Sequence, residues 1–124
     1  MPPVSNQSNI TYFKREEFSC FCCNKNKVSD KLLSLLETCR SVYGKSMFIE
    51  SGYRCEKHNA EVGGAPESAH VKGEAADIRC LSSSDRYALL RVLLTFGAKR
   101  IGLHEKFIHV DVSETLAQNV MWIY

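Results

Sequence analysis

The sequence has no long apolar run, no excess of charge of one sign and no internal repeat. A membrane-spanning helix needs roughly 18 consecutive apolar residues, and no run approaches that length, so we expect no membrane span. The formal net charge is only +2, and the basic residues form no stripe that alternates with aromatics, so nucleic acid is not an expected partner. The first residues, MPPVSNQSNITYF, lack the basic start and apolar run of a secretory signal, so we expect synthesis in the cytoplasm.

Cysteine, in contrast, is abundant, because six of the 124 residues are cysteines. An even number suits a disulfide framework if the protein is exported. Reduced structural thiols and a second metal site are the alternatives, and the sequence leaves all three open. We interpret Cys20, Cys22 and Cys23 as too closely spaced for a standard C-x-x-C zinc knuckle, although together with Cys39 they could in principle form one.

The length of 124 residues fits one domain, residues 1–124, with a single hydrophobic core. Hydrophobic residues make up 44% of the chain and charged residues 24%, as in ordinary globular proteins. Residues 1–10 are polar and contain two prolines, so we expect a loose arm there. The rest predicts an α+β fold, in which a small antiparallel sheet carries the functional site and two main helices pack on its other face.

Two segments have the apolar spacing of helices. The first follows Ser29, a candidate N-cap, and Gly44 is a suitable residue to end it. The second follows Ser84, covers residues 85–96 and is apolar on nearly every side. We therefore expect the second helix to be the main packing element of the core.

Short strands and turns fill most of the remaining chain. We expect strands at residues 47–50, 75–80, 99–103 and 107–112, and one helical turn at residues 56–59. Alternation places Asp77 on the polar face of its strand, and His109 and Asp111 together on one face of theirs. Residues 113–124 receive no assignment.

Two histidines and a carboxylate are candidate metal ligands. A catalytic zinc site needs about three nitrogen or oxygen ligands from the protein and a fourth position for water. His70, Asp77 and His109 provide that set, if the strand with His109 pairs with the strand of Asp77. Taken singly, each of these residue types is more often an ordinary solvated or hydrogen-bonded side chain than a metal ligand.

A series of short motifs covers residues 47–112. The sequence contains, in order, SGYR, HN, VGG, the pattern S-x-H-x-x-G-x-A-x-D and finally HVDV. This order resembles the zinc D-Ala-D-Ala carboxypeptidases and related peptidoglycan metallopeptidases, in particular short bacterial and phage members that include endolysins. The resemblance implies that zinc-activated water hydrolyses peptide bonds in peptidoglycan stem peptides, with carboxypeptidase or endopeptidase specificity.

The resemblance also implies roles for individual residues. His70, Asp77 and His109 would bind one Zn²⁺ per chain, Arg54 would bind the substrate carbonyl or the oxyanion, and Ser68 would lie beside the substrate. Such roles suit the chemistry, because zinc acidifies a bound water and a guanidinium stabilises a developing negative charge.

The general base is the point where the sequence departs from the family pattern. Many members place a Glu or Asp three residues before the last zinc histidine, where this chain has Lys106. Asp111 and Glu105 are the alternative carboxylates, with Asp111 slightly favoured, and His104 could assist as an acid or stabiliser. We interpret His58 as a surface residue.

Two other functions compete with the peptidase hypothesis. One is a non-catalytic zinc-binding module of the same fold that binds the cell wall or a protein partner. A structure in which Glu105, Asp111 and His104 all point away from the metal would favour this hypothesis. The other is a metal-free domain held by disulfides. For the peptidase we expect a monomer that acts on the wall after release or non-standard export.

Overall fold

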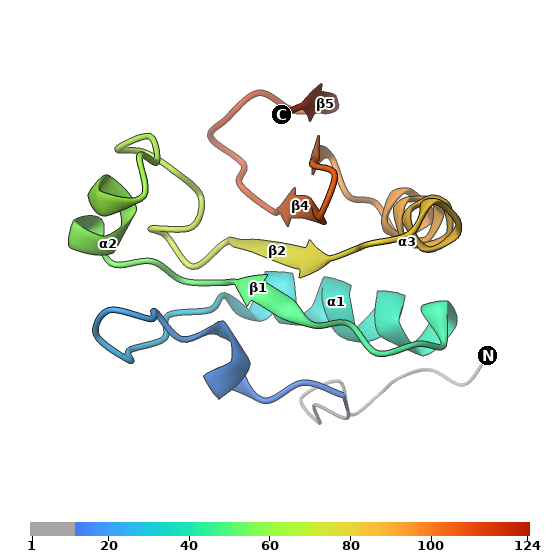
Figure 1. Cartoon of the computed structure of the whole chain (residues 1–124), viewed down its shortest axis with the longest axis horizontal. Helices are drawn as coiled ribbons and strands as arrows, with labels where there is room; N and C mark the ends of the chain where they lie inside the picture. Colours follow the sequence, from blue (N-terminus) through green and yellow to red (C-terminus); the bar gives the residue numbers. More distant parts are fainter. Residues whose placement is uncertain (1–11) are drawn as a thin grey trace.

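The computed structural model of the chain describes residues 12–124. The predicted loose arm at residues 1–10 lies outside the described residues. The elements follow one another as η1 (Arg15–Phe18), α1 (Asp30–Tyr43), β1 (Ile49–Ser51), α2 (Glu56–Glu61), β2 (Ala75–Arg79), α3 (Ser83–Thr95), β3 (Arg100–Leu103), β4 (Phe107–Asp111) and β5 (Val120–Ile123). Figure 1 shows these elements arranged around one sheet, so the predicted α+β class is confirmed.

The sheet has five strands in the order β1-β2-β4-β3-β5. The pairs β1/β2, β2/β4 and β4/β3 are antiparallel, as predicted, whereas β5 pairs in parallel with β3. Strand β5 lies within residues 113–124, for which no secondary structure was predicted from the sequence. Its sequence, VMWI, is rich in β-branched and aromatic residues, which favour a strand.

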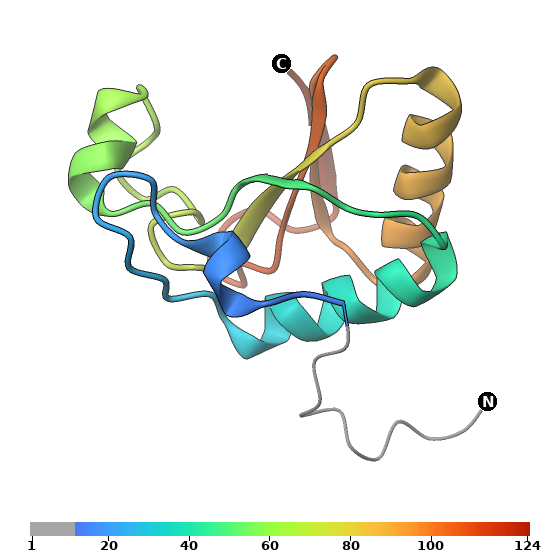
Figure 2. The ribbon, with the colours of Figure 1, turned by 60° about the horizontal axis from the view of Figure 1, so that its bottom comes forward.

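Helices α1 and α3 pack on the same side of the sheet, as Figure 2 shows. Helix α1 begins and ends as predicted: the Ser29 side chain accepts a hydrogen bond from the Leu32 amide, and Gly44 adopts a φ of 77°. Helix α3 begins earlier than predicted, because Ser82 and not Ser84 accepts the hydrogen bond of the Asp85 amide. Three consecutive serines precede Asp85, so residue type alone could not select the cap. Within residues 12–124, no helix is both long and apolar enough to cross a membrane.

The prediction that the second helix dominates the core is wrong. Leu89 and Leu93 of α3 are buried, but Leu94 is 48% exposed and Phe96, which follows the helix, is 39% exposed. Helix α1 buries more side chains than α3 does. The apolar residues on the outer side of α3 therefore face solvent and contribute little to the core.

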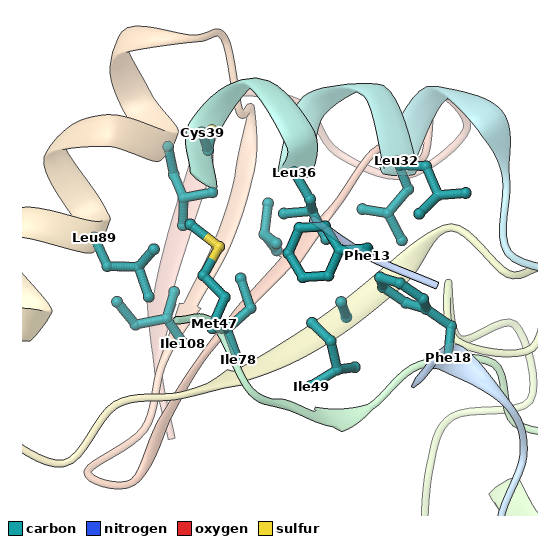
Figure 3. Close-up of a cluster of buried hydrophobic side chains, with 14 of the residues drawn as sticks. Phe13, Phe18, Leu32, Leu36, Cys39, Met47, Ile49, Ile78, Leu89 and Ile108 are labelled. Carbon is teal, nitrogen blue, oxygen red and sulfur yellow. The ribbon is translucent and has the colours of Figure 1, made fainter. Parts of the chain in front are cut away.

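The core lies between these helices and one face of the sheet (Figure 3). Leu36 of α1, Ile78 of β2 and Ile108 of β4 are fully buried there. The segment before α1 closes one end of the core with Phe13 and Phe18, whose rings pack edge to face with centroids 5.8 Å apart. Alternate residues of a strand point to opposite faces of the sheet. The residues directly before and after Ile78 in β2, and directly before and after Ile108 in β4, therefore project from the face opposite the core.

The remaining strand predictions are confirmed with small shifts at their ends. Strand β1 starts at Ile49, two residues later than expected, and the expected helical turn continues to Glu61 as helix α2. Strands β2 and β4 pair so that Asp77 faces His109 directly. This register brings two predicted metal ligands together on the face that the two main helices leave uncovered.

Candidate metal centre and active-site cleft

The three predicted metal ligands lie together. Asp77 and His109 are cross-strand partners on β2 and β4, and His70 comes from the loop that precedes β2. One ligand atom from each residue lies within 4.8 Å of the ligand atoms of the other two. Their side chains are 14%, 8% and 3% exposed, in that order, so the group is largely shielded from solvent.

Gly73 allows the chain to turn from His70 into β2. It has a φ of 72°, a left-handed conformation that a side chain disfavours. A Cβ atom at this position would lie 1.9 Å from the carbonyl oxygen of Lys27. The glycine of the S-x-H-x-x-G pattern is therefore required both by backbone conformation and by the close approach of the segment before α1.

Each histidine directs one ring nitrogen at Asp77. Oδ1 of Asp77 lies 3.3 Å from Nε2 of His70 and 2.9 Å from Nδ1 of His109. The opposite nitrogens are held by other acceptors: Nδ1 of His70 is 2.7 Å from the Gly52 carbonyl, and Nε2 of His109 is 2.7 Å from Oδ2 of Asp111. Metal-binding histidines typically have this second hydrogen bond, because it fixes the ring and its tautomer. The donor set and its supports therefore fit a zinc ion.

The charges of the group reinforce each other. Burial opposes ionisation of Asp77, but hydrogen bonds from His109 and His70 outweigh burial and hold the pKa of this carboxyl well below its usual range. Burial likewise opposes protonation of His109, but hydrogen bonds to Asp111 and Asp77 raise the pKa of the imidazole. Asp77 is thus an anion at neutral pH, as a zinc ligand must be.

Three hydrogen-bond donors contact the carboxylate of Asp111. It is 2% exposed, and Nε of Arg100 lies 2.9 Å from Oδ1 and 3.1 Å from Oδ2. The amide of Ser113 also donates to Oδ1, at 3.1 Å, while Oδ2 contacts His109. A carboxylate with both oxygens engaged in this way is suited to orienting His109 and poorly suited to accepting a further proton.

A cleft of about 510 Å³ opens beside the metal-binding group. Its lining includes five of the residues predicted for the site: Arg54, Ser68, His70, His109 and Asp111. Arg54 is half-buried, and its Nε is buried without a hydrogen-bond partner among residues 12–124. The Ser68 hydroxyl accepts a hydrogen bond from the His70 amide at 3.1 Å, so Ser68 also supports the loop.

His104 and Glu105 are not among the residues that line the cleft. The His104 ring stacks on Phe107 with centroids 4.3 Å apart, and its Nδ1 accepts a hydrogen bond from the Lys106 amide. Glu105 is exposed in the turn between β3 and β4, where its carbonyl oxygen accepts a hydrogen bond from Arg86.

Several cleft residues were not predicted from the sequence. Trp122 and Tyr124, at the C-terminal end of the chain, form part of the cleft wall, and Glu67 lines the cleft from the loop before His70. The Trp122 ring approaches His109, with centroids 5.3 Å apart, by passing over Gly102 of β3; a Cβ there would lie 2.5 Å from the indole nitrogen. The only sequence signal for this wall is the aromatic and β-branched run at residues 120–124.

Comparison with known proteins agrees with this geometry. The family model described as Peptidase M15 matches residues 11–111, which include the metal-binding group and all four strands from β1 to β4. No curated protein matches the chain. The family match confirms the resemblance inferred from the motifs. The chain therefore belongs to the Peptidase M15 family, whose members are zinc-dependent metallopeptidases.

Proposed function

We propose that this protein hydrolyses peptide bonds in the stem peptides of peptidoglycan, with zinc held by His70, Asp77 and His109. The observation that carries the proposal is the pair of imidazoles that each direct one nitrogen at Asp77 while the other nitrogen is fixed. When bound there, zinc would lower the pKa of water and polarise the scissile carbonyl. The family match supports peptidase chemistry, and a cleft of about 510 Å³ lies beside these residues.

Arg54 binds the carbonyl oxygen of the scissile bond in this proposal. Its guanidinium lines the cleft, and its buried Nε has no partner among the described residues, so a polar ligand would satisfy it. A preorganised cation stabilises the negative charge that develops on this oxygen during hydrolysis. The same cation suits stem peptides, because they carry carboxylates. Ser68, on the loop before His70, contacts the substrate backbone.

Proton transfer is assigned to a different residue from those predicted. Asp111 positions His109, since its oxygens already accept hydrogen bonds from Arg100 and Ser113. Glu67 is the other carboxylate among the lining residues, is exposed, and has no ion-pair or hydrogen-bond partner in the described chain. We assign the role of proton acceptor to Glu67, with Asp111, Glu105 and His104 as the alternatives that mutagenesis must compare.

The proposal is tested with purified zinc-loaded protein and defined muropeptides. Monomeric pentapeptide muropeptides and cross-linked dimers should be incubated separately, and the products identified by mass spectrometry. Release of D-Ala from the monomer would indicate a carboxypeptidase, and conversion of dimers to monomers an endopeptidase. His109→Ala should yield neither product. Loaded wild-type protein that leaves every muropeptide intact would contradict the proposal.

A non-catalytic zinc-binding module is the second candidate function. One observation favours it: Lys106 occupies the position of the expected carboxylate, while His104 and Glu105 lie outside the cleft lining. Such a module would bind purified cell walls without releasing fragments. Co-sedimentation of the loaded protein with intact walls, combined with the absence of soluble products, would select this function over hydrolysis.

A further inference from the structure

A second group of possible metal ligands lies outside the cleft. The sulfur atoms of Cys20, Cys23 and Cys55 lie within 4.8 Å of one another, although Cys55 is far from the other two in sequence. Cys39, considered above as a partner of the first cysteines, belongs instead to the hydrophobic core, where its thiol contacts the Val92 carbonyl. The sequence-based choice of Cys39 is therefore wrong, and Cys55 takes its place.

The loop that carries Cys20 and Cys23 is closed by its own backbone. The amide of Asn24 donates to the Cys20 carbonyl and the amide of Cys20 to the Lys25 carbonyl, both at 2.8 Å. Asn24 has a φ of 64°, which reverses the chain directly after Cys23. Cys20 and Cys23 are separated by two residues, as in a C-x-x-C knuckle, so the interpretation that the cysteines are too closely spaced is corrected by this loop.

The Cys20 sulfur accepts a backbone hydrogen bond from the segment that carries Cys55. The Cys55 amide donates to it at 3.4 Å. A sulfur that accepts a hydrogen bond from an amide is better able to carry negative charge, as thiolate ligands of metals do.

Helix α2 supplies the opposite side of the group. Cys55 is the N-cap of this helix, and its sulfur accepts a hydrogen bond from the His58 amide at 3.4 Å. Two further side chains border the group. Cys22 lies in the loop between Cys20 and Cys23, and the His58 ring, on α2, packs edge to face on Phe21 with centroids 6.1 Å apart.

We propose that Cys20, Cys23 and Cys55 bind a structural Zn²⁺ ion, with Cys22 as the fourth ligand. Thiolates in a C-x-x-C loop are preferred zinc ligands, and a site with four protein ligands leaves no position for a substrate. A disulfide would join only two of the three clustered sulfurs and would leave the third unused. Three convergent sulfurs therefore favour a metal over a cross-link.

The ion would fasten the N-terminal segment to the chain that supports the cleft. In Figures 1 and 2 the loop after η1 reaches the base of α2. The Tyr53 amide already donates to the Phe18 carbonyl at 2.8 Å, and the residues on either side are Gly52, which holds the His70 ring, and Arg54. This positioning effect rests on the proposed function, whereas metal binding by the cysteines does not.

Metal analysis separates the two sites. Wild-type protein purified under reducing conditions should contain two zinc ions per chain, and both Cys20→Ser/Cys23→Ser and His70→Ala/His109→Ala should contain one. Cys80→Ala removes a buried thiol outside the cluster and should retain two ions. Loss of one zinc ion in the cysteine variant would support this inference, whatever the histidine variant contains. A histidine variant that kept both zinc ions would count against the proposed function only. An unchanged zinc content in the cysteine variant would overturn the inference.

Two measurements that leave all the cysteines in place remain informative if the cysteine variant does not fold. Cobalt-substituted protein should show thiolate-to-metal charge-transfer absorption that His70→Ala/His109→Ala retains. Iodoacetamide should leave Cys20, Cys23 and Cys55 unmodified until a chelator is added. Modification at the same rate with and without chelator, or a disulfide found by non-reducing mass spectrometry, would contradict the site.

The fourth ligand is identified by single substitutions in the cobalt-substituted protein. Cys22→Ser should weaken the charge-transfer band, whereas His58→Ala should leave it unchanged. A spectrum altered by His58→Ala and unaffected by Cys22→Ser would overturn the assignment of Cys22.

Discussion

Asp77 and His109 face each other across β2 and β4, and Oδ1 of Asp77 lies 2.9 Å from Nδ1 of His109. The pairing register of two strands thus brings together two of the three candidate metal ligands without any contribution from a loop. His70 completes the group from the segment before β2. A site built mainly on paired strands is held more rigidly than one built on loops.

Asp77→Asn should remove the ion from this group while the fold is retained. The amide has nearly the shape of the carboxylate but lacks its charge, and the oxygen ligands of zinc in proteins are ionised carboxylates. Asp85→Asn is the control, because Asp85 is a surface carboxylate paired with Lys45. Zinc content, measured beside the circular dichroism spectrum, checks the expectation, and a full zinc complement in Asp77→Asn would contradict it.

Asp111→Asn should weaken zinc binding without abolishing it. Asp111 contacts the far nitrogen of His109, and loss of such a support typically lowers metal affinity by about 10–100-fold. A competition titration with a chromogenic chelator gives the affinity. Glu114→Gln, which removes an exposed carboxylate paired with Lys31, should leave the affinity unchanged. Equal affinities of wild-type and Asp111→Asn protein would exclude the orienting role.

Arg54→Lys should lower kcat/KM for a muropeptide by about 10²–10³-fold, because a correctly placed oxyanion donor contributes roughly this factor. Lysine keeps the charge but cannot reproduce the geometry of the guanidinium. Zinc content should not change. Arg79→Lys is the matched control, since Arg79 pairs on the surface with Glu50. Full activity of the Arg54 variant would remove Arg54 from the reaction.

Glu67→Gln should decrease kcat while zinc content and thermal stability stay constant. General bases contribute about 10²–10⁴-fold to the rates of enzymatic proton transfer. Glu105→Gln, which changes an exposed carboxylate outside the cleft lining, should remain active. If Glu105→Gln loses activity and Glu67→Gln does not, the sequence-based candidate is correct and our assignment is wrong.

Gly73→Ala should destabilise the fold more than Gly63→Ala. Both glycines have a positive φ, 72° and 75°, so both substitutions carry the left-handed backbone penalty of about 1–2 kcal/mol. Only at Gly73 would the new Cβ also collide with backbone, at the Lys27 carbonyl. Urea denaturation gives the two free energies of unfolding. Equal decreases in the free energy of unfolding would show that the segment before α1 moves aside at little cost and does not constrain the turn after His70.

The parts of the fold with regular periodicity were predictable. Alternation in the strands of Asp77 and His109 assigned both residues to the polar face, and capping residues defined helix α1. The cap of α3 was missed because Ser82 and Ser84 are equally suitable by residue type. Strand β5 was missed because it is short and follows an irregular segment, so its parallel pairing with β3 has no local signal.

Contacts between residues that are far apart in the sequence explain the other differences between the predicted and the observed structure. The engagement of Asp111 depends on the β3/β4 register, which places Arg100 opposite it. The approach of Cys55 to Cys20 depends on how two irregular segments pack, and no periodic pattern encodes that contact. Sequence motifs selected His70, Asp77 and His109, which the structure brings together, but they could not show which neighbouring carboxylate is free.

The central claim is most directly tested by adding zinc to metal-free protein while the cleavage of a muropeptide is followed. The metal-free protein should be inactive, activity should appear as zinc is restored, and His109→Ala should remain inactive at every zinc concentration. Equal cleavage by metal-free and zinc-loaded wild-type protein would contradict a zinc-dependent reaction at His70, Asp77 and His109.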